Sequence, residues 1–135
     1  MKKELARKNE ARLLAERSGL VVKYVSHDVI ADYNATYNVN YRGQHIITNA
    51  AKELGIPLNE IWISEKWRPY EQYILHHEIR EIQLRAEGLE PEEAHNRTCG
   101  EEANKWRNDA VWQRMVKEIS EQDRKTAEKK RRGLS

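Results

Sequence analysis

Three side chains capable of acid–base or metal chemistry interrupt an apolar stretch. They are His77, Glu78 and Glu81, within the run YILHHEIREIQ (73–83). A helix turns by about 100° per residue, so His77 and Glu81 lie about 40° apart on one face, among the Ile and Leu residues of the run. Burying a carboxylate without a partner costs roughly several kcal/mol or forces its protonation. A divalent metal ion would supply the missing partner.

The spacing of these residues predicts two metal ligands and one base. Helical residues four apart have Cβ atoms about 5–6 Å from each other. An imidazole nitrogen of His77 and a carboxylate oxygen of Glu81 can therefore reach one ion at roughly 2.0–2.2 Å, the range of zinc. Glu78 points about 100° away from His77, so it misses the ion and can meet a water molecule beside it. We predict that Glu78 is the general base.

A third ligand is expected from the following helix. Glu81 and His95 each lie seven residues from Gly88, so an antiparallel helical hairpin turning at Gly88 would bring them level. His95 shares a helix face with Cys99 and Glu102, which we expect to be the buried face. The sequence therefore predicts His77, Glu81 and His95 as the ligands of one zinc ion per chain.

Side chains around the ligands have secondary roles in this interpretation. Glu102 is expected either on the surface or beside the ligands, and Cys99 is expected to be a small packed residue. His76 and Arg80 are expected on the solvated face of their helix, where they can contact substrate at most.

The motif resembles a known group of enzymes. The run from His77 to Glu81, HEIRE, resembles the HExxE variant of the zincin signature of zinc metallopeptidases. The wider run over about 69–106 is also similar to small zincin-like proteins of archaea and of their viruses and plasmids. This resemblance implies a zinc-dependent peptidase acting on peptides or proteins. Glu81 stands where most zincins carry histidine, and its negative charge makes a bound zinc ion a weaker Lewis acid.

Other interpretations of the same residues stay open. His77 and Glu81 could form a hydrogen-bonded pair, with Arg80 or Arg85 balancing the carboxylates. The motif would then be a polar core network, or a structural metal site, in a non-catalytic interaction or nucleic-acid-associated protein of a mobile element that uses the basic ends at 2–12 and 124–132. A di-iron bundle is excluded, because the Glu-x-x-His spacing that ends at His95 occurs only once.

Composition limits the class of protein. The chain has 135 residues with 24 basic and 22 acidic side chains, a net charge of +2, so nucleic acid is an unexpected partner. No apolar run approaches the length of a membrane span. A single cysteine cannot form an internal disulfide, which together with the absence of a signal pattern predicts a cytoplasmic protein. The abundance of Glu, Lys and Arg suits the ion-pair networks of a thermophile.

The predicted elements give an α+β fold. We expect one minimal zincin-like domain over 1–135, in which a small antiparallel or mixed sheet packs against the helical hairpin that carries HExxE. Apolar periodicity and turn residues predict helices over 1–18, 44–55, 69–87 and 91–106, strands over 20–25, 36–41 and 59–65, a last helix through Val111 and Ile119, and a frayed basic tail over 124–135.

Two further expectations concern how these elements are arranged. The apolar stripes of the last two helices fall on nearly opposite sides, so a break is predicted near 107–109. The strand over 59–65 is the one along which an extended peptide substrate is expected to lie.

Overall fold

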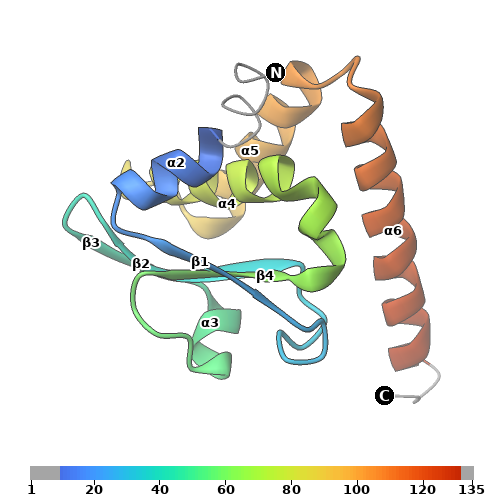
Figure 1. Ribbon diagram of the computed structural model, residues 1–135, viewed down its shortest axis with the longest axis horizontal. Helices are drawn as coiled ribbons and strands as arrows, with labels where there is room; N and C mark the ends of the chain where they lie inside the picture. The colour runs from blue at the N-terminus through green and yellow to red at the C-terminus, as the bar shows by residue number, and fades with distance from the viewer. Residues whose placement is uncertain (1–9, 132–135) are drawn as a thin grey trace.

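A four-stranded mixed sheet forms the centre of the computed structural model, which describes residues 10–131 (Figure 1). Its strands lie in the order β1 (Val21–Val25), β4 (Glu60–Ser64), β2 (Ala35–Tyr41) and β3 (Gln44–Ile47). β1 and β4 are parallel, whereas β4 pairs with β2, and β2 with β3, in the antiparallel sense. The predicted α+β class with a small mixed sheet is confirmed.

Helices cover both faces of this sheet, and a further helix lies beside it. Helices α2 (Glu10–Arg17), α4 (Glu71–Ala86) and α5 (Pro91–Lys105) lie on the same side, and the short α3 (Asn49–Leu54) lies on the other (Figure 1). The 3-10 helix η1 (Glu65–Tyr70) leads into α4, and α6 (Ala110–Arg131) runs alongside the body of the molecule. Among residues 10–131, no helix has the length and apolar character that a bilayer crossing requires.

Alternation along β2 explains how the sheet holds α4. Tyr37, Val39 and Tyr41 are buried at every second position, as expected of a strand with one face on the core. They belong to the same hydrophobic cluster as Leu75 and Ile82 of α4, both of which are inaccessible to solvent. The helix that carries the motif is therefore fixed against the sheet by its apolar residues.

The helix predicted over 44–55 is wrong in its first part. Residues 44–47 form β3, which pairs with β2 in a hairpin, and only 49–54 are helical. The turn residues Arg42 and Gly43 have φ angles of 50° and 78°, and two consecutive positive φ values are typical of a tight two-residue hairpin turn. Thr48 then begins α3, because its hydroxyl accepts a hydrogen bond from the Ala51 N–H.

Particular residues mark where the later helices end and begin. Gly88, with a φ of 107°, lies in the turn between α4 and α5. The predicted break near 107–109 is confirmed, since Asp109 accepts hydrogen bonds from the N–H groups of Val111 and Trp112 and so begins α6. Of the predicted helix over 1–18, α2 covers 10–17, and α6 stays helical to 131. Residues 1–9 and 132–135 lie outside the described residues.

The strand expected to receive a peptide cannot do so. β4 is an interior strand that pairs with β1 on one side and with β2 on the other. Its backbone N–H and C=O groups are therefore already engaged, and a peptide cannot add to it by strand pairing. In the described sheet the edges are β1 and β3.

A polar contact between α2, β1 and α4 gives a first testable prediction. Glu71 accepts two hydrogen bonds from Arg12, at 2.9 and 2.6 Å, and one from the Tyr24 hydroxyl at 2.6 Å. Because these groups are partly exposed, we expect Glu71→Gln to lower the free energy of unfolding by only about 1–2 kcal/mol at pH 7. Urea denaturation measures this difference.

The same contact predicts how that difference depends on pH. The hydrogen bonds from Arg12 lower the pKa of Glu71 below its ordinary value, against the effect of burial. The stabilisation is therefore present above the unfolded-state pKa of about 4.3 and is lost as the pH falls through the folded-state value. The variant and the wild type should converge at low pH, whereas Glu53→Gln, at an exposed site on α3, should change little at any pH. An undiminished difference in strong acid would contradict the assignment.

Candidate metal centre

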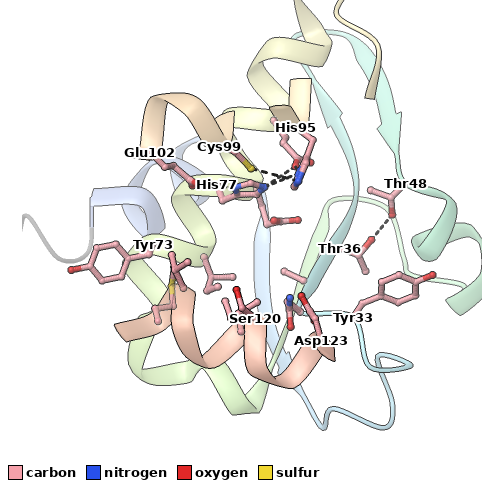
Figure 2. A pocket seen from close by; sticks show the side chains of 18 of the residues that line it. Tyr33, Thr36, Thr48, Tyr73, His77, His95, Cys99, Glu102, Ser120 and Asp123 are labelled. Atoms are coloured by element: carbon pink, nitrogen blue, oxygen red, sulfur yellow. Dashed lines mark hydrogen bonds and ion pairs between the residues drawn. The ribbon is translucent and has the colours of Figure 1, made fainter. Parts of the chain in front are cut away.

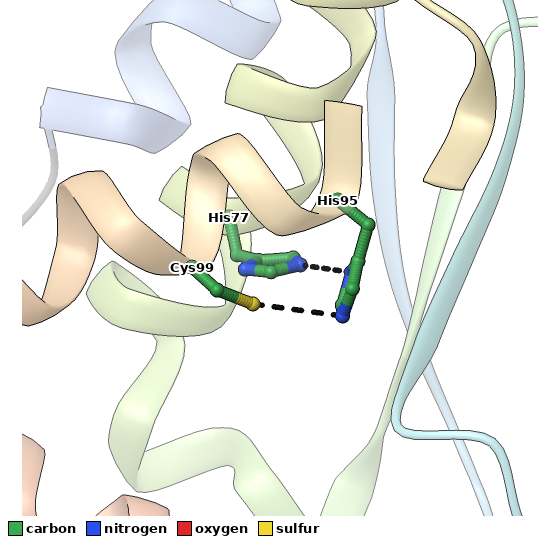
Figure 3. A group of neighbouring side chains, drawn as sticks. All are labelled: His77, His95 and Cys99. Carbon is green, nitrogen blue, oxygen red and sulfur yellow. Dashed lines mark hydrogen bonds between the residues drawn. The ribbon is translucent and has the colours of Figure 1, made fainter. Parts of the chain in front are cut away.

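Helices α4 and α5 bring three potential ligand atoms together. His77 Nε2 lies 2.8 Å from Glu81 Oε2, and His95 Nδ1 lies 2.7 Å from the same oxygen. The two ring nitrogens are 3.2 Å apart (Figure 3). His77 and Glu81 come from successive turns of α4, and His95 comes from the first half of α5. The closeness of Glu81 and His95 that the sequence predicts is therefore found, whereas their role as ligands stays a prediction.

The donor atoms of this triangle lie closer together than the ligands of a zinc ion. Four ligands at 2.0–2.1 Å from a tetrahedral zinc ion lie about 3.3 Å from one another. The three separations, from 2.7 to 3.2 Å, are slightly shorter, as expected when hydrogen bonds rather than an ion hold the groups. An ion would therefore require outward shifts of about half an ångström or less.

Glu102 fixes the ring of His77 from behind. Its two carboxylate oxygens lie 2.9 and 3.0 Å from His77 Nδ1, and its side chain is buried. An Nδ1–H that donates to a carboxylate leaves Nε2 directed at the site, which is how metal-binding histidines are usually oriented. Glu102 is thus found beside a predicted ligand, as the sequence analysis expects.

Without an ion, the cluster depends on protons held by its histidines. Burial lowers the pKa of His77, but the hydrogen bonds with Glu102 and Glu81 outweigh it and raise that pKa to about 11. Burial likewise opposes the ionisation of Glu81, but its contacts with His77 and His95 lower its pKa. Both imidazoles need a proton on the nitrogen that faces Glu81, which places two N–H donors within 3.2 Å. One cation in the triangle would replace both protons.

Glu78 differs from its neighbours because it has no partner. Its side chain is 8% exposed and makes no hydrogen bond or ion pair within the described residues. Burial raises the pKa of Glu78 to about 8, the charge of Glu81 adds to the rise, and His77 opposes it. Such a buried carboxyl group with a shifted pKa, next to convergent polar groups, is typical of functional sites.

A pocket of about 770 Å³ opens beside the cluster (Figure 2). One wall carries the polar residues His77, Glu78, Glu81 and His95, and the facing wall is formed by α6. This volume lies within the range of about 300–1,000 Å³ usual for ligand-binding pockets. Glu78 and the three donor atoms therefore face a space that could hold a substrate.

The orientation of α5 differs from the predicted one. The face expected to bury contains His95 and Cys99, yet both are exposed. The buried positions of α5 are Ala94, Thr98 and Glu102. Ala94 and Thr98 each come one residue before the expected positions, His95 and Cys99. α5 has no large apolar side chain on either stripe, so the sequence fixes its rotation weakly. The rotation found turns His95 and Cys99 toward the pocket.

Arg80 and His76, which flank the motif on α4, make contacts outside the pocket. Arg80 pairs with Glu101 of α5 through hydrogen bonds of 2.8 and 3.1 Å, so it links the helices and does not line the pocket. His76 packs edge-on against Trp106 with ring centroids 4.9 Å apart, and it is only partly exposed. Both side chains keep partial exposure, and neither lines the pocket.

Cys99 is the site residue that the sequence analysis missed. Its Sγ lies 3.5 Å from His95 Nε2, and donor atoms of His77, His95 and Cys99 lie within 4.8 Å of one another (Figure 3). Its position four residues after His95 was the available signal. We favour Glu81 over Cys99 as the third donor, because Glu81 shares the Nδ1 side of His95 with His77, whereas Cys99 faces the opposite nitrogen.

The chain matches no protein-family model, no curated protein and no solved structure. A function must therefore be inferred from the site itself. Chemically, the site offers two imidazoles and a carboxylate for one cation, and a second carboxyl group with a pKa raised to about 8, all facing one pocket.

Proposed function

We propose that this protein is a zinc-dependent hydrolase, most naturally a peptidase, with a zincin-like helical hairpin formed by α4 and α5. The proposal is carried by one observation. His77 Nε2, Glu81 Oε2 and His95 Nδ1 converge to within 3.2 Å, and the largely buried side chain of Glu78 lines the same pocket. Two histidines and a carboxylate are a donor set found in catalytic zinc sites, which keep a fourth position for water or substrate.

Each side chain has a defined role in this proposal. His77, Glu81 and His95 would hold the ion, and Glu102 would keep the ring of His77 oriented through Nδ1. A bound zinc ion supplies polarisation of a substrate carbonyl and a lowered pKa for water. Glu78 accepts the proton of the attacking water and then delivers it to the amine that leaves. No further acid is needed for this cycle.

The acid–base properties of Glu78 suit that task. Proton transfer is most effective when the pKa of the transferring group lies near the working pH. Burial and the nearby Glu81 raise the pKa of Glu78 to about 8 in the metal-free chain. An additional cation would lower it toward neutrality, because an opposite charge favours the carboxylate form. Glu78 would then exchange protons readily in both directions.

A non-catalytic role is the alternative that a specific observation favours. His77, Glu81, Glu102 and His95 already satisfy one another by hydrogen bonds and ion pairs, which is what a polar core network would do. Glu78 argues against it, because its largely buried carboxyl group takes no part in these hydrogen bonds and ion pairs, and a polar core network does not require it. The pocket is a second feature that such a network does not require.

Metal removal distinguishes these two functions. We expect protein purified from zinc-supplemented cells to contain about one zinc per chain by elemental analysis. It should cleave a mixture of unstructured peptides, lose that activity with a chelator, and regain it when zinc is returned. If the protein binds no zinc when zinc is supplied in excess, and cleaves no peptide, the polar core network is supported instead. Stoichiometric zinc without any hydrolysis would indicate a structural metal site.

A further inference from the structure

Helix α6 contributes one continuous face to the pocket. The residues that line it recur every three or four positions, as on one side of a helix, and are Trp112, Met115, Val116, Ile119, Ser120 and Asp123. The first four are apolar and the last two are polar. The face is therefore graded along the helix axis, from an apolar portion to an acidic end.

The length of this face suits an extended peptide. From Trp112 to Asp123 the helix rises by about 16 Å, which equals about five residues of extended chain. In Figure 2, α6 crosses the pocket on the side opposite His77 and His95, with Asp123 toward Tyr33 and Thr36. A peptide lying along α6 would therefore present its backbone to the candidate metal centre.

Charge defines what the acidic end of the face would accept. Four carboxyl groups line the pocket, those of Glu78, Glu81, Glu102 and Asp123, and none of the lining residues is Lys or Arg. Glu81 and Glu102 are bonded to histidines. Asp123 is exposed and has no hydrogen-bond or ion-pair partner in the described part of the chain. A cationic group of a ligand is the complement that this position lacks.

The distance between the apolar and acidic positions sets a spacing in the peptide. Ile119 and Asp123 are four residues apart, a rise of about 6 Å along α6. Two residues of extended chain span about 6.6 Å, and side chains two apart point to the same side. An apolar side chain on Ile119 and a basic one on Asp123 would thus be separated by a single residue.

We propose that this pocket binds extended peptides in which a large apolar residue is separated from a Lys or Arg by one residue. The reaction that follows binding rests on the proposed function, and the inference adds the substrate class to it. Val116 and Ile119 select the apolar side chain, and Asp123 selects the basic one. Acidic peptides are rejected, because Asp123 repels them and no Lys or Arg lines the pocket to bind them.

Peptide binding can be measured apart from hydrolysis. The full chain is kept in chelator, and fluorescence anisotropy follows labelled, end-blocked peptides of seven residues built on a Gly/Ser background. The central residues are Leu-Ser-Lys, Leu-Ser-Glu, Ala-Ser-Lys or the adjacent Leu-Lys. We expect Leu-Ser-Lys to bind about tenfold tighter than each of the others, since each loses the apolar contact, the charge pair or the spacing.

Variants of α6 test which residue selects the charge. Asp123→Asn should reduce the preference for Lys over Glu by about fivefold or more, and Asp123→Lys should reverse it. Glu121→Gln removes the same charge two positions away, outside the pocket, and should leave the preference unchanged. Equal binding of all four peptides, or equal effects of Asp123→Asn and Glu121→Gln, would overturn the proposal.

The remaining outcomes separate this inference from the proposed function and from self-association. Selective binding without zinc-dependent cleavage would uphold the peptide pocket and refute the hydrolase. Cleavage of peptides without regard to the Leu-Ser-Lys spacing would do the reverse. If light scattering shows a dimer that Val116→Asp dissociates, and no peptide binds, the apolar face of α6 is covered by a second copy of the chain and the proposal fails.

Discussion

His77→Ala should reduce the zinc content from about one ion per chain to none. The substitution removes a donor that lies 2.8 Å from Glu81 and 3.2 Å from His95. It also leaves Glu102 without the ring that it orients. Two remaining protein ligands are fewer than the three that catalytic zinc sites use, so bound metal should be lost on dialysis. Elemental analysis measures the result.

Controls make that experiment decisive even if His77→Ala folds poorly. His95→Ala removes a ligand at an exposed position and leaves the buried ion pairs of His77 in place, so it should also lose zinc while the fold persists. His45→Ala, at an exposed site on β3, should keep full occupancy. Glu102→Gln should bind zinc about 10–100-fold more weakly without abolishing binding. Full zinc occupancy in His95→Ala would remove the proposed ligand set.

Local rules predicted most of the elements around the motif. The strand over 36–41 and the helices on either side of Gly88 follow from alternation, helical periodicity and turn residues within about 15 positions. The break before α6 was predicted because the apolar stripes on either side of it point in different directions. The closeness of Glu81 to His95 needed only equal distances from one turn. These features depend on neighbours in sequence, and so one sequence contained them.

Features that depend on distant parts of the chain could not be obtained in this way. Ile46 and Ile47 fit a helical pattern, yet they belong to β3, because pairing with β2 outweighs their local preference. β4 was expected to be open to a peptide, yet β1, which lies about forty residues earlier, occupies that side. A single sequence does not state strand order.

The rotation of α5 and the position of α6 show the same limit at the site. Cys99 was expected to be buried, but the small residues Ala94 and Thr98 pack inward and turn it toward the pocket. Nothing in the spacing of the HExxE motif indicated that α6 would form the wall facing it. The convergence of the candidate donor atoms was thus predictable from local geometry, whereas the shape of the pocket depended on how whole helices pack.

Glu78→Gln should abolish hydrolysis while the zinc content stays at about one per chain. The amide has the size of the carboxyl group but cannot accept a proton from water, and loss of a general base lowers rates by about 10²–10⁴-fold. The ligands His77, Glu81 and His95 are untouched, so the metal should remain. Glu87→Gln, at the exposed end of α4, should retain activity. Loss of zinc in Glu78→Gln would make Glu78 a ligand and overturn its role as base.

The same substitution should stabilise the metal-free protein. Burial, reinforced by Glu81, raises the pKa of Glu78 to about 8, well above its unfolded value of about 4.3. Folding therefore takes up a proton between these two pH values, and the wild type loses stability as the pH rises through that window. Glutamine has no such dependence. In chelator, the melting temperature of Glu78→Gln should exceed that of the wild type at pH 8.5 by more than at pH 5, and a smaller gap at the higher pH would show that Glu78 is stably ionised in the folded protein.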